Sequence, residues 1–156
     1  MSKHLIRGRG LTADRETRVQ HQFNDNAIRY SHNLGQSAGM QRIGVHQVRI
    51  EPGRDSTTHH YHDADEEFIY ILSGQGQARI GDEVFAVEAG DFMGFPAPSP
   101  GHSMTNTGAE DLVYLMGGER WATDLVHYPD LNRTLLKSHG RRTWIEDDAE
   151  TELPPR

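Results

Sequence analysis

The sequence predicts an all-β protein, either a sandwich or a barrel. From Ile43 onward the chain is a series of short runs rich in β-branched and aromatic residues, and Gly, Pro, Asn or Asp closes each run. The runs are IGVHQVRI, EEFIYIL, GQARI, EVFAVE, DFMGF, HSMTN and LVYLM. Strands at such regular spacing are typical of β-sandwiches and β-barrels.

Two turns in this region predict hairpins. The pair Gly81-Asp82 separates two short alternating runs, and residues 88–91 (Glu-Ala-Gly-Asp) separate two more. Each turn supplies a residue that tolerates a positive φ angle, as tight hairpin turns require. We therefore expect consecutive strands to pair antiparallel across both turns.

The length of 156 residues predicts a single domain. Residues 1–40 are polar and lack periodicity, so we expect an N-terminal arm that packs late or on a partner subunit. The barrel domain is expected over residues 41–128, with the run LVHY as its last strand. Residues 129–156 form a C-terminal extension, in which we expect an edge strand near residues 142–145 and a disordered acidic end, EDDAETELPPR.

Composition narrows the classes of function. Charged residues make up 25% of the chain, hydrophobic residues 35%, and the mean hydropathy is −0.73, as in a soluble globular protein without a membrane span. The N-terminus lacks the features of a secretory signal, so we expect a cytoplasmic protein. The net charge of −7 argues against a nucleic-acid partner. Because the chain contains no cysteine, any metal must be bound by nitrogen and oxygen ligands.

Four residues have the spacing of a mononuclear metal site. Side chains alternate along a strand, so His60 and His62 point to one face while Tyr61 points to the other. An acidic turn then reverses the chain, and Glu67 opens the next strand. A proline-rich bend delivers His102 to a further strand. Imidazole and carboxylate suit borderline and hard cations, and four protein ligands leave an octahedral ion two open positions.

Each part of this pattern has a simpler interpretation. Two histidines in an isolated HxH are commonly strand residues without a metal, and Glu67 alone would be a surface carboxylate. The order of the paired histidines, the glutamate, the closing glycine and the second glycine-proline-histidine segment favours the metal site.

These residues resemble the two motifs of the cupin superfamily. The first motif is similar to Gly53, His60, His62, Glu67 and Gly74, and the second to Gly90, Pro96, His102 and Asn106. The resemblance covers residues 44–118, about half of the chain. It implies a double-stranded β-helix, or jelly roll, a site of three histidines and one glutamate inside it, and frequently a homodimer. The segments MGGER and DLVHYPDL also resemble a little-characterised bacterial group of single-domain cupins.

Two departures from the cupin pattern lie in loops. The spacing from Gly53 to His60 is one residue longer than usual, and Pro98 replaces the usual glycine, with one extra residue before His102. Insertions of this kind are tolerated because the entropy cost of loop closure grows slowly with length. They leave one alternative register, in which His59 replaces His60. That register would turn Tyr61 toward the site and lose the second imidazole.

We expect a metal-dependent enzyme that acts on a small organic acid or carbonyl compound. The ion would be Fe²⁺, Mn²⁺, Ni²⁺ or Zn²⁺, and the reaction could be that of an oxygenase, a decarboxylase or an isomerase. No catalytic residue is assigned. The alternative is a non-catalytic module that binds a metal or a metabolite, because the cupin fold serves many functions.

Other candidate residues have simpler expected roles. Arg49 and Arg79 could clamp a substrate carboxylate, although long cations on strands usually lie at the surface. His46 is expected to be a core histidine, the acidic turn at 63–66 to be solvated, and the basic segment 137–142 to be a solvated loop. Surface positions are expected for His4, His21, His32 and His139. Core positions are expected for Met93, Phe95, Met104 and Met116.

Overall fold

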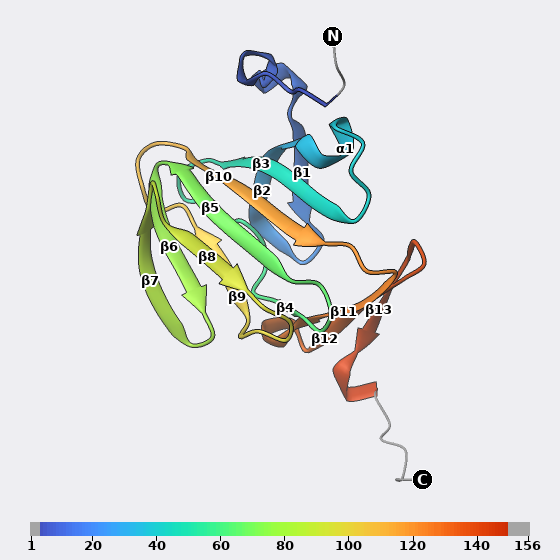
Figure 1. Cartoon of the computed structure of the whole chain (residues 1–156). Coiled ribbons are helices and arrows are strands. Elements are labelled where there is room, and N and C mark those ends of the chain that lie inside the picture. The colour runs from blue at the N-terminus through green and yellow to red at the C-terminus, as the bar shows by residue number, and fades with distance from the viewer. Residues whose placement is uncertain (1–3, 150–156) are drawn as a thin grey trace.

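The computed structural model describes residues 4–149 and is built almost entirely of strands, which confirms the all-β prediction (Figure 1). The strands are β1 (Thr17–His21), β2 (Asn24–Asn33), β3 (Ile43–Ile50), β4 (Tyr61–His62), β5 (Glu67–Ser73), β6 (Gln75–Ile80), β7 (Glu83–Glu88), β8 (Phe92–Phe95), β9 (His102–Thr105), β10 (Leu112–Glu119), β11 (Thr123–Tyr128), β12 (Arg133–Ser138) and β13 (Arg141–Glu146). The helical turns are η1 (Gly8–Gly10), η2 (Ala13–Arg15), α1 (Leu34–Ser37), η3 (Pro129–Leu131) and η4 (Asp147–Ala149).

The strands form a jelly roll. One sheet has the order β1-β2-β3-β10-β5-β8, and the opposite wall is made of β7-β6-β9 and of β13-β12-β11-β4. Every paired strand is antiparallel to its neighbour. Strand β10 lies at the centre of the larger sheet, between β3 and β5. A sheet of this kind buries one face against the other sheet and leaves the opposite face exposed.

The core lies between the two walls. Leu112 and Tyr114 of β10, Ile50 of β3 and Ile71 of β5 are almost completely buried there, opposite Met104 of β9. Burial of one such side chain contributes about 1.5–3 kcal/mol, so this cluster is the main source of stability for the barrel. The predicted core positions of Met93, Phe95 and Met104 are confirmed, while Met116 is partly buried at the edge of the cluster.

Only one of the two predicted hairpins forms. Gly81 has a φ angle of 57° between β6 and β7, which pair as expected. Gly90 also has a positive φ angle, of 101°, but β7 and β8 do not pair. The Gly90 amide instead donates to the carbonyl of Ile71 in β5, and β8 pairs with β5. The second hairpin prediction is therefore wrong, because this turn carries the chain from one sheet to the other.

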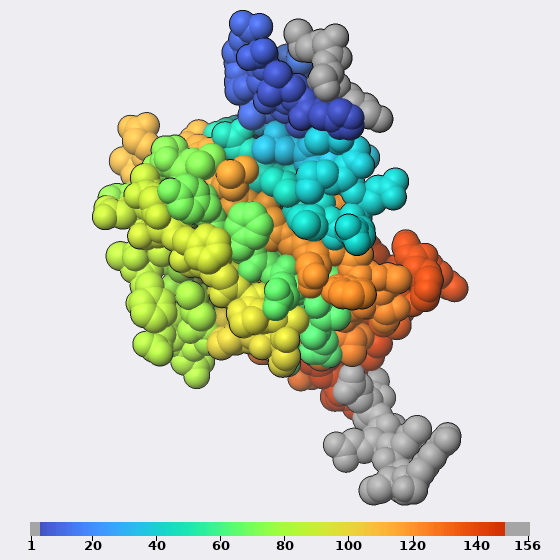
Figure 2. All heavy atoms as spheres, in the orientation of Figure 1, coloured from blue at the N-terminus to red at the C-terminus, as the bar shows by residue number. Residues whose placement is uncertain are grey.

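Both ends of the chain contribute strands. Residues 17–33 form β1 and β2, and β2 pairs with β3, so this segment extends the larger sheet. The turns η1 and η2 stand out from the body of the molecule (Figure 2). Near the other end, the expected strands at LVHY and at 142–145 are present as β11 and β13, the latter at a sheet edge.

The C-terminal segment also contains one strand that the sequence did not predict. Strand β12 was not anticipated, and it joins β11 to β13. Residues 147–149 form η4, and the rest of the end expected to be disordered lies outside the described residues. The boundaries at residues 40 and 128 remain predictions.

No helix within residues 4–149 has the length and apolar character needed to cross a membrane.

Candidate metal centre

Main-chain pairing places the histidines of the predicted site. His60 and His102 form a β-bridge in which each amide donates to the carbonyl of the other residue, at 3.2 and 2.8 Å. His62 follows on the same face of the chain, whereas the ring of Tyr61 turns away and stacks on His127 at 4.7 Å. The backbone thus presents imidazoles from two separate segments to one place.

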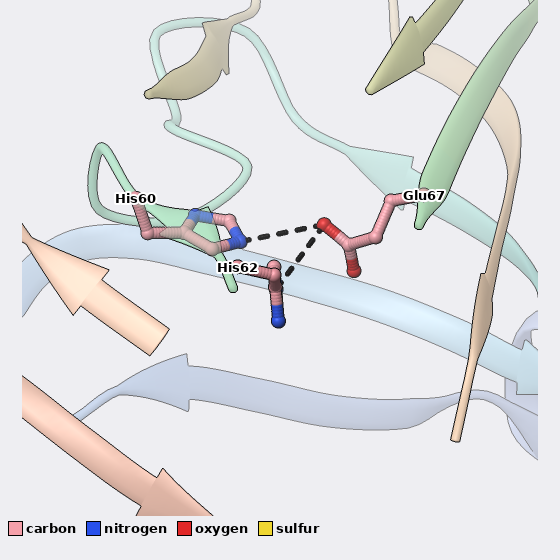
Figure 3. Close-up of side chains that lie close together, drawn as sticks. All are labelled: His60, His62 and Glu67. Carbon is pink, nitrogen blue, oxygen red and sulfur yellow. Dashed lines mark ion pairs between the residues drawn. The ribbon is translucent and has the colours of Figure 1, made fainter. Parts of the chain in front are cut away.

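Glu67 meets these imidazoles from the first position of β5. Its Oε2 atom lies 3.6 Å from Nε2 of His60, 3.3 Å from Nε2 of His62 and 3.1 Å from Nε2 of His102. Figure 3 shows His60, which precedes β4, and His62 of β4 close to Glu67 of β5, and the ligand atoms of these three residues all lie within 4.8 Å of one another. The structure therefore brings the four predicted side chains together.

The tautomer of His60 fits a bound cation. Its Nδ1 atom lies 2.9 Å from the carbonyl of Thr58, which can only accept, so Nδ1 carries the proton. Burial lowers the pKa of His60, which keeps the ring neutral. The lone pair on Nε2 then faces the carboxylate of Glu67. Two electron-pair donors facing each other in a buried site are favourable when a cation lies between them.

His62 is oriented by Asp124, a buried carboxylate at the start of β11. The Nδ1 atom of His62 donates to Oδ2 of Asp124 at 2.7 Å, which leaves Nε2 facing Glu67. Burial disfavours a charged imidazole, but the hydrogen bonds to Asp124 and Glu67 outweigh it and raise the pKa of His62 to about 9. The chain therefore has an imidazole held between two carboxylates.

The carboxyl groups of Glu67 and Asp124 are both held ionised. Burial would raise the pKa of Glu67, but the three imidazoles lower it well below its usual range. Burial likewise opposes ionisation of Asp124, and its hydrogen bonds with His62, Lys137 and the Ala64 amide lower its pKa. A divalent ion would displace the Nε2 proton of His62, and the carboxylate and the imidazoles then form a nitrogen and oxygen donor set that fits such an ion.

Comparisons with known proteins agree with this geometry. The family model described as "Cupin domain" matches residues 46–118. The crystal structure of a protein from Acidithiobacillus ferrooxidans, named provisionally as a sugar phosphate isomerase, is 32% identical to this chain with a TM-score of 0.94. The match covers 98% of both chains. This chain belongs to the cupin superfamily.

Two further solved structures resemble this cupin. A sugar phosphate isomerase of the cupin superfamily from Silicibacter pomeroyi is 26% identical, with a TM-score of 0.80, and the match covers 92% of this chain and 96% of that one. A predicted oxalate decarboxylase from Thermotoga maritima is 20% identical, with a TM-score of 0.59 over 70% of this chain and 97% of that one, and it supports the fold alone. Among the curated proteins, none matches this cupin.

His102, the third histidine of the predicted site, is held by packing. The ring of His102 stacks on Phe95 with centroids 3.7 Å apart and planes 6° apart. Its Nδ1 atom is buried and has no hydrogen-bond partner among the described residues. His102 is thus oriented by the aromatic contact and by its backbone bridge to His60.

His59 points away from Glu67 in this cupin. Its Nδ1 atom lies 3.4 Å from the hydroxyl of Ser103, and the ring packs on Gly101. A Cβ atom on Gly101 would lie 2.5 Å from Nε2 of His59, so the backbone approaches the ring closely. This placement agrees with the register in which His60 faces Glu67.

Two expectations about charged segments are wrong. Asp65, expected in a solvated turn, has an exposure of only 5%, and it accepts the Trp121 amide. Lys137, expected in a solvated loop, lies between Asp65 and Asp124, with its Nζ atom 2.6 and 2.7 Å from their Oδ2 atoms. The reason is tertiary, because β12 brings Lys137 against the turn. His62, Asp65 and Asp124 also have the spacing of a second cation site, but Lys137 already provides the cation there.

A cavity opens on one side of the site. Its volume is about 590 Å³, and it reaches His60, His62 and Glu67. His21, expected at the surface, is half-buried in its wall, where its ring packs on Tyr128 at 5.3 Å. The walls also include Val19, Gln20, Gln22, Arg29, Thr57, Met116, Val126, Leu135, Lys137, Arg142 and Trp144. Strands from both ends of the chain therefore surround the predicted metal ligands.

Proposed function

We propose that this cupin is a metal-dependent enzyme that acts on a small organic acid or carbonyl compound. The convergence of three histidine Nε2 atoms on one oxygen of Glu67, beside a cavity of about 590 Å³, carries the proposal. The proposed ligands are His60, His62, Glu67 and His102, and the proposed ion is Fe²⁺, Mn²⁺, Ni²⁺ or Zn²⁺. When bound, such an ion would act as a Lewis acid toward a substrate oxygen.

The chain's own residues prepare the site for that ion. Thr58 and Asp124 hold the Nδ1 protons of His60 and His62, so that the Nε2 atoms of both rings face Glu67. Phe95 covers one face of His102 and excludes water from it. The cavity leaves the remaining side of the cluster accessible to a small molecule.

Isomerisation is the first reaction to test among oxygenation, decarboxylation and isomerisation. Two of the most similar structures carry the name sugar phosphate isomerase, one of them provisionally. Their similarity over more than nine-tenths of this chain includes the strands that form the cavity walls. Binding without turnover of any tested substrate would favour the alternative, a non-catalytic module. We also propose that the protein is a cytoplasmic homodimer.

Metal content tests the proposed site directly. We expect the purified protein to carry about one divalent ion per chain, because four ligands converge on one point. His60→Ala and His102→Ala should each abolish metal retention, whereas His59→Ala, which faces Ser103, should retain it. The measurement is elemental analysis of protein purified without chelator. No metal in the wild-type protein, or equal loss from His59→Ala, would contradict the assignment.

A further inference from the structure

The cavity beside the predicted metal site has an unusual charge for this chain. The net charge of the protein is −7. In the cavity wall, however, Glu67 is the only carboxylate, and three side chains are cationic: Arg29, Lys137 and Arg142. Because Glu67 faces the predicted cation, the rest of the wall presents positive charge to a molecule in the cavity.

Two of these three cations have no carboxylate partner. Lys137 is held between Asp65 and Asp124. Arg29 donates from Nη1 to the carbonyl of Ser56 at 3.3 Å, and within residues 4–149 it forms no ion pair. Arg142 lies exposed at the rim of the same cavity and also forms no ion pair within that range.

Arg49 and Arg79, the two candidates for binding a substrate carboxylate, lie in a different environment. Arg49 binds Glu16 at 2.8 Å and Asp111 at 3.0 Å, and its guanidinium packs over Tyr30. Arg79 binds Asp130 at 2.6 Å. Neither lines a cavity that reaches the predicted metal ligands. The guanidinium groups without a carboxylate partner, those of Arg29 and Arg142, therefore line the cavity that reaches the predicted metal ligands.

Arg29 and Arg142 act on the same part of the cavity from different strands. Arg29 belongs to β2, whereas Arg142 belongs to β13. Burial lowers the pKa of His21, and the positive charges of both arginines lower it further. Burial raises the pKa of Tyr128 to about 12, and the same two charges act against that rise. Both arginines line the same cavity as these two rings, which pack on each other at 5.3 Å.

We propose that Arg29 and Arg142 bind the phosphate group of a phosphorylated substrate in this cavity. This inference rests on the proposed function, because it assumes that the rest of the substrate reaches Glu67 and the three histidines. A guanidinium group matches the oxygens of a phosphate with two parallel hydrogen bonds. The cavity volume of about 590 Å³ suits a small metabolite.

The number of unpaired cations favours phosphate over carboxylate. A phosphate monoester carries close to two negative charges at neutral pH, whereas a carboxylate carries one. Two arginines without carboxylate partners match the larger charge. A half-buried guanidinium is also less favourable without a counter-charge, and a bound phosphate would supply it.

Calorimetric titration with inorganic phosphate tests this site on the full-length protein. Arg29→Gln and Arg142→Gln should each weaken phosphate binding by about tenfold, the usual effect of one lost charge-assisted hydrogen bond. The double variant should show no measurable binding. Arg18→Gln is the matched control, because Arg18 is an exposed arginine of β1 that contacts Gln20 and does not line the cavity. Its phosphate affinity should equal that of the wild type.

Further titrations separate the alternatives. Acetate should bind much more weakly than phosphate, and equal binding would overturn the assignment to phosphate. Loss of phosphate binding in His102→Ala, with retention in both arginine variants, would show that phosphate binds the metal and would also overturn it. Arg142→Gln decides the question if Arg29→Gln unfolds, because Arg142 is exposed. Failure of the proposed enzymatic function would leave the arginine dependence of phosphate binding intact, so the two failures are distinguishable.

Discussion

Single side chains determine which atom of each histidine faces the site. His62 is the clearest case, since its Nδ1 proton is held by Asp124 and its Nε2 atom is left toward Glu67. Asp124 is itself fixed, because its Oδ1 atom accepts the backbone amide of Ala64. An outer carboxylate of this kind fixes the orientation of a metal-binding imidazole and increases its basicity.

Asp124→Asn should weaken metal binding by about 10- to 100-fold, the usual effect of removing an outer-shell carboxylate. The substitution keeps the size of the side chain and removes its charge. Competition with a coloured chelator would measure the affinity. Asp63→Asn is the control, because Asp63 pairs with His127 at the surface. An unchanged affinity in Asp124→Asn would mean that Asp124 does not position His62.

At the scale of strands and turns, Lys137 connects three parts of the chain. It lies on β12 and binds Asp124 of β11 and Asp65 of the turn before β5. The side chain of Asp124 is fully buried and that of Asp65 nearly so. The ammonium group thus supplies the counter-charge for two carboxylates that have little contact with water.

Lys137→Met should lower the free energy of unfolding by about 3 kcal/mol, because it leaves buried Asp65 without its counter-charge and removes one of the two counter-charges of Asp124. Urea denaturation would measure the change. For comparison, Arg79→Met removes an exposed ion pair with Asp130 and should cost less than about 1 kcal/mol. Equal effects of the two substitutions would contradict the structural role of Lys137.

Patterns within one strand could be predicted from sequence, and pairings between distant segments could not. The two-residue period places His60 and His62 on one face with Tyr61 on the other, as the structure has them. In contrast, the contact between Lys137 and Asp65 joins residues 72 positions apart. The turn at Gly90 has hairpin chemistry, but the Gly90 amide and the Asp91 carbonyl form hydrogen bonds with Ile71 of β5. Local preferences do not determine which sheet receives the next strand.

The placement of Arg29 and Arg142 in one cavity also depends on pairings between distant segments, which the sequence does not predict. Arg29 lies in a polar segment without periodicity, and Arg142 lies in a basic cluster that resembles a solvated loop. Only the pairing of β2 with β3, and of β13 with β12, brings both to one cavity. A sequence pattern cannot distinguish these arginines from Arg49, which has carboxylate partners.

At the scale of the whole molecule, two exposed aromatic side chains lie side by side on one outer face. Tyr70 of β5 and Phe92 of β8 are neighbours across the two strands, with exposures of 40% and 64%. The face of the molecule in Figure 2 includes the green and yellow segments that contain these strands. Exposed aromatic residues are enriched in interfaces between subunits.

Light scattering of the full-length protein should give a mass of two chains of 17.6 kDa each. Phe92→Glu should shift the protein toward the mass of one chain, because it would place a charge in the apolar contact. Val84→Glu, on the exposed part of β7, serves as the comparison. A wild-type mass of one chain at micromolar concentration would contradict the homodimer proposal.

The paired amides and carbonyls of His60 and His102 have a practical consequence for work on this protein. These two histidines are spaced by main-chain hydrogen bonds that need no ion. The spacing of these two proposed ligands is thus set by the backbone and should be the same whichever ion is added. Removing any bound metal with a chelator should leave the circular dichroism of the protein unchanged. The binding of different divalent ions could then be compared in the same folded protein.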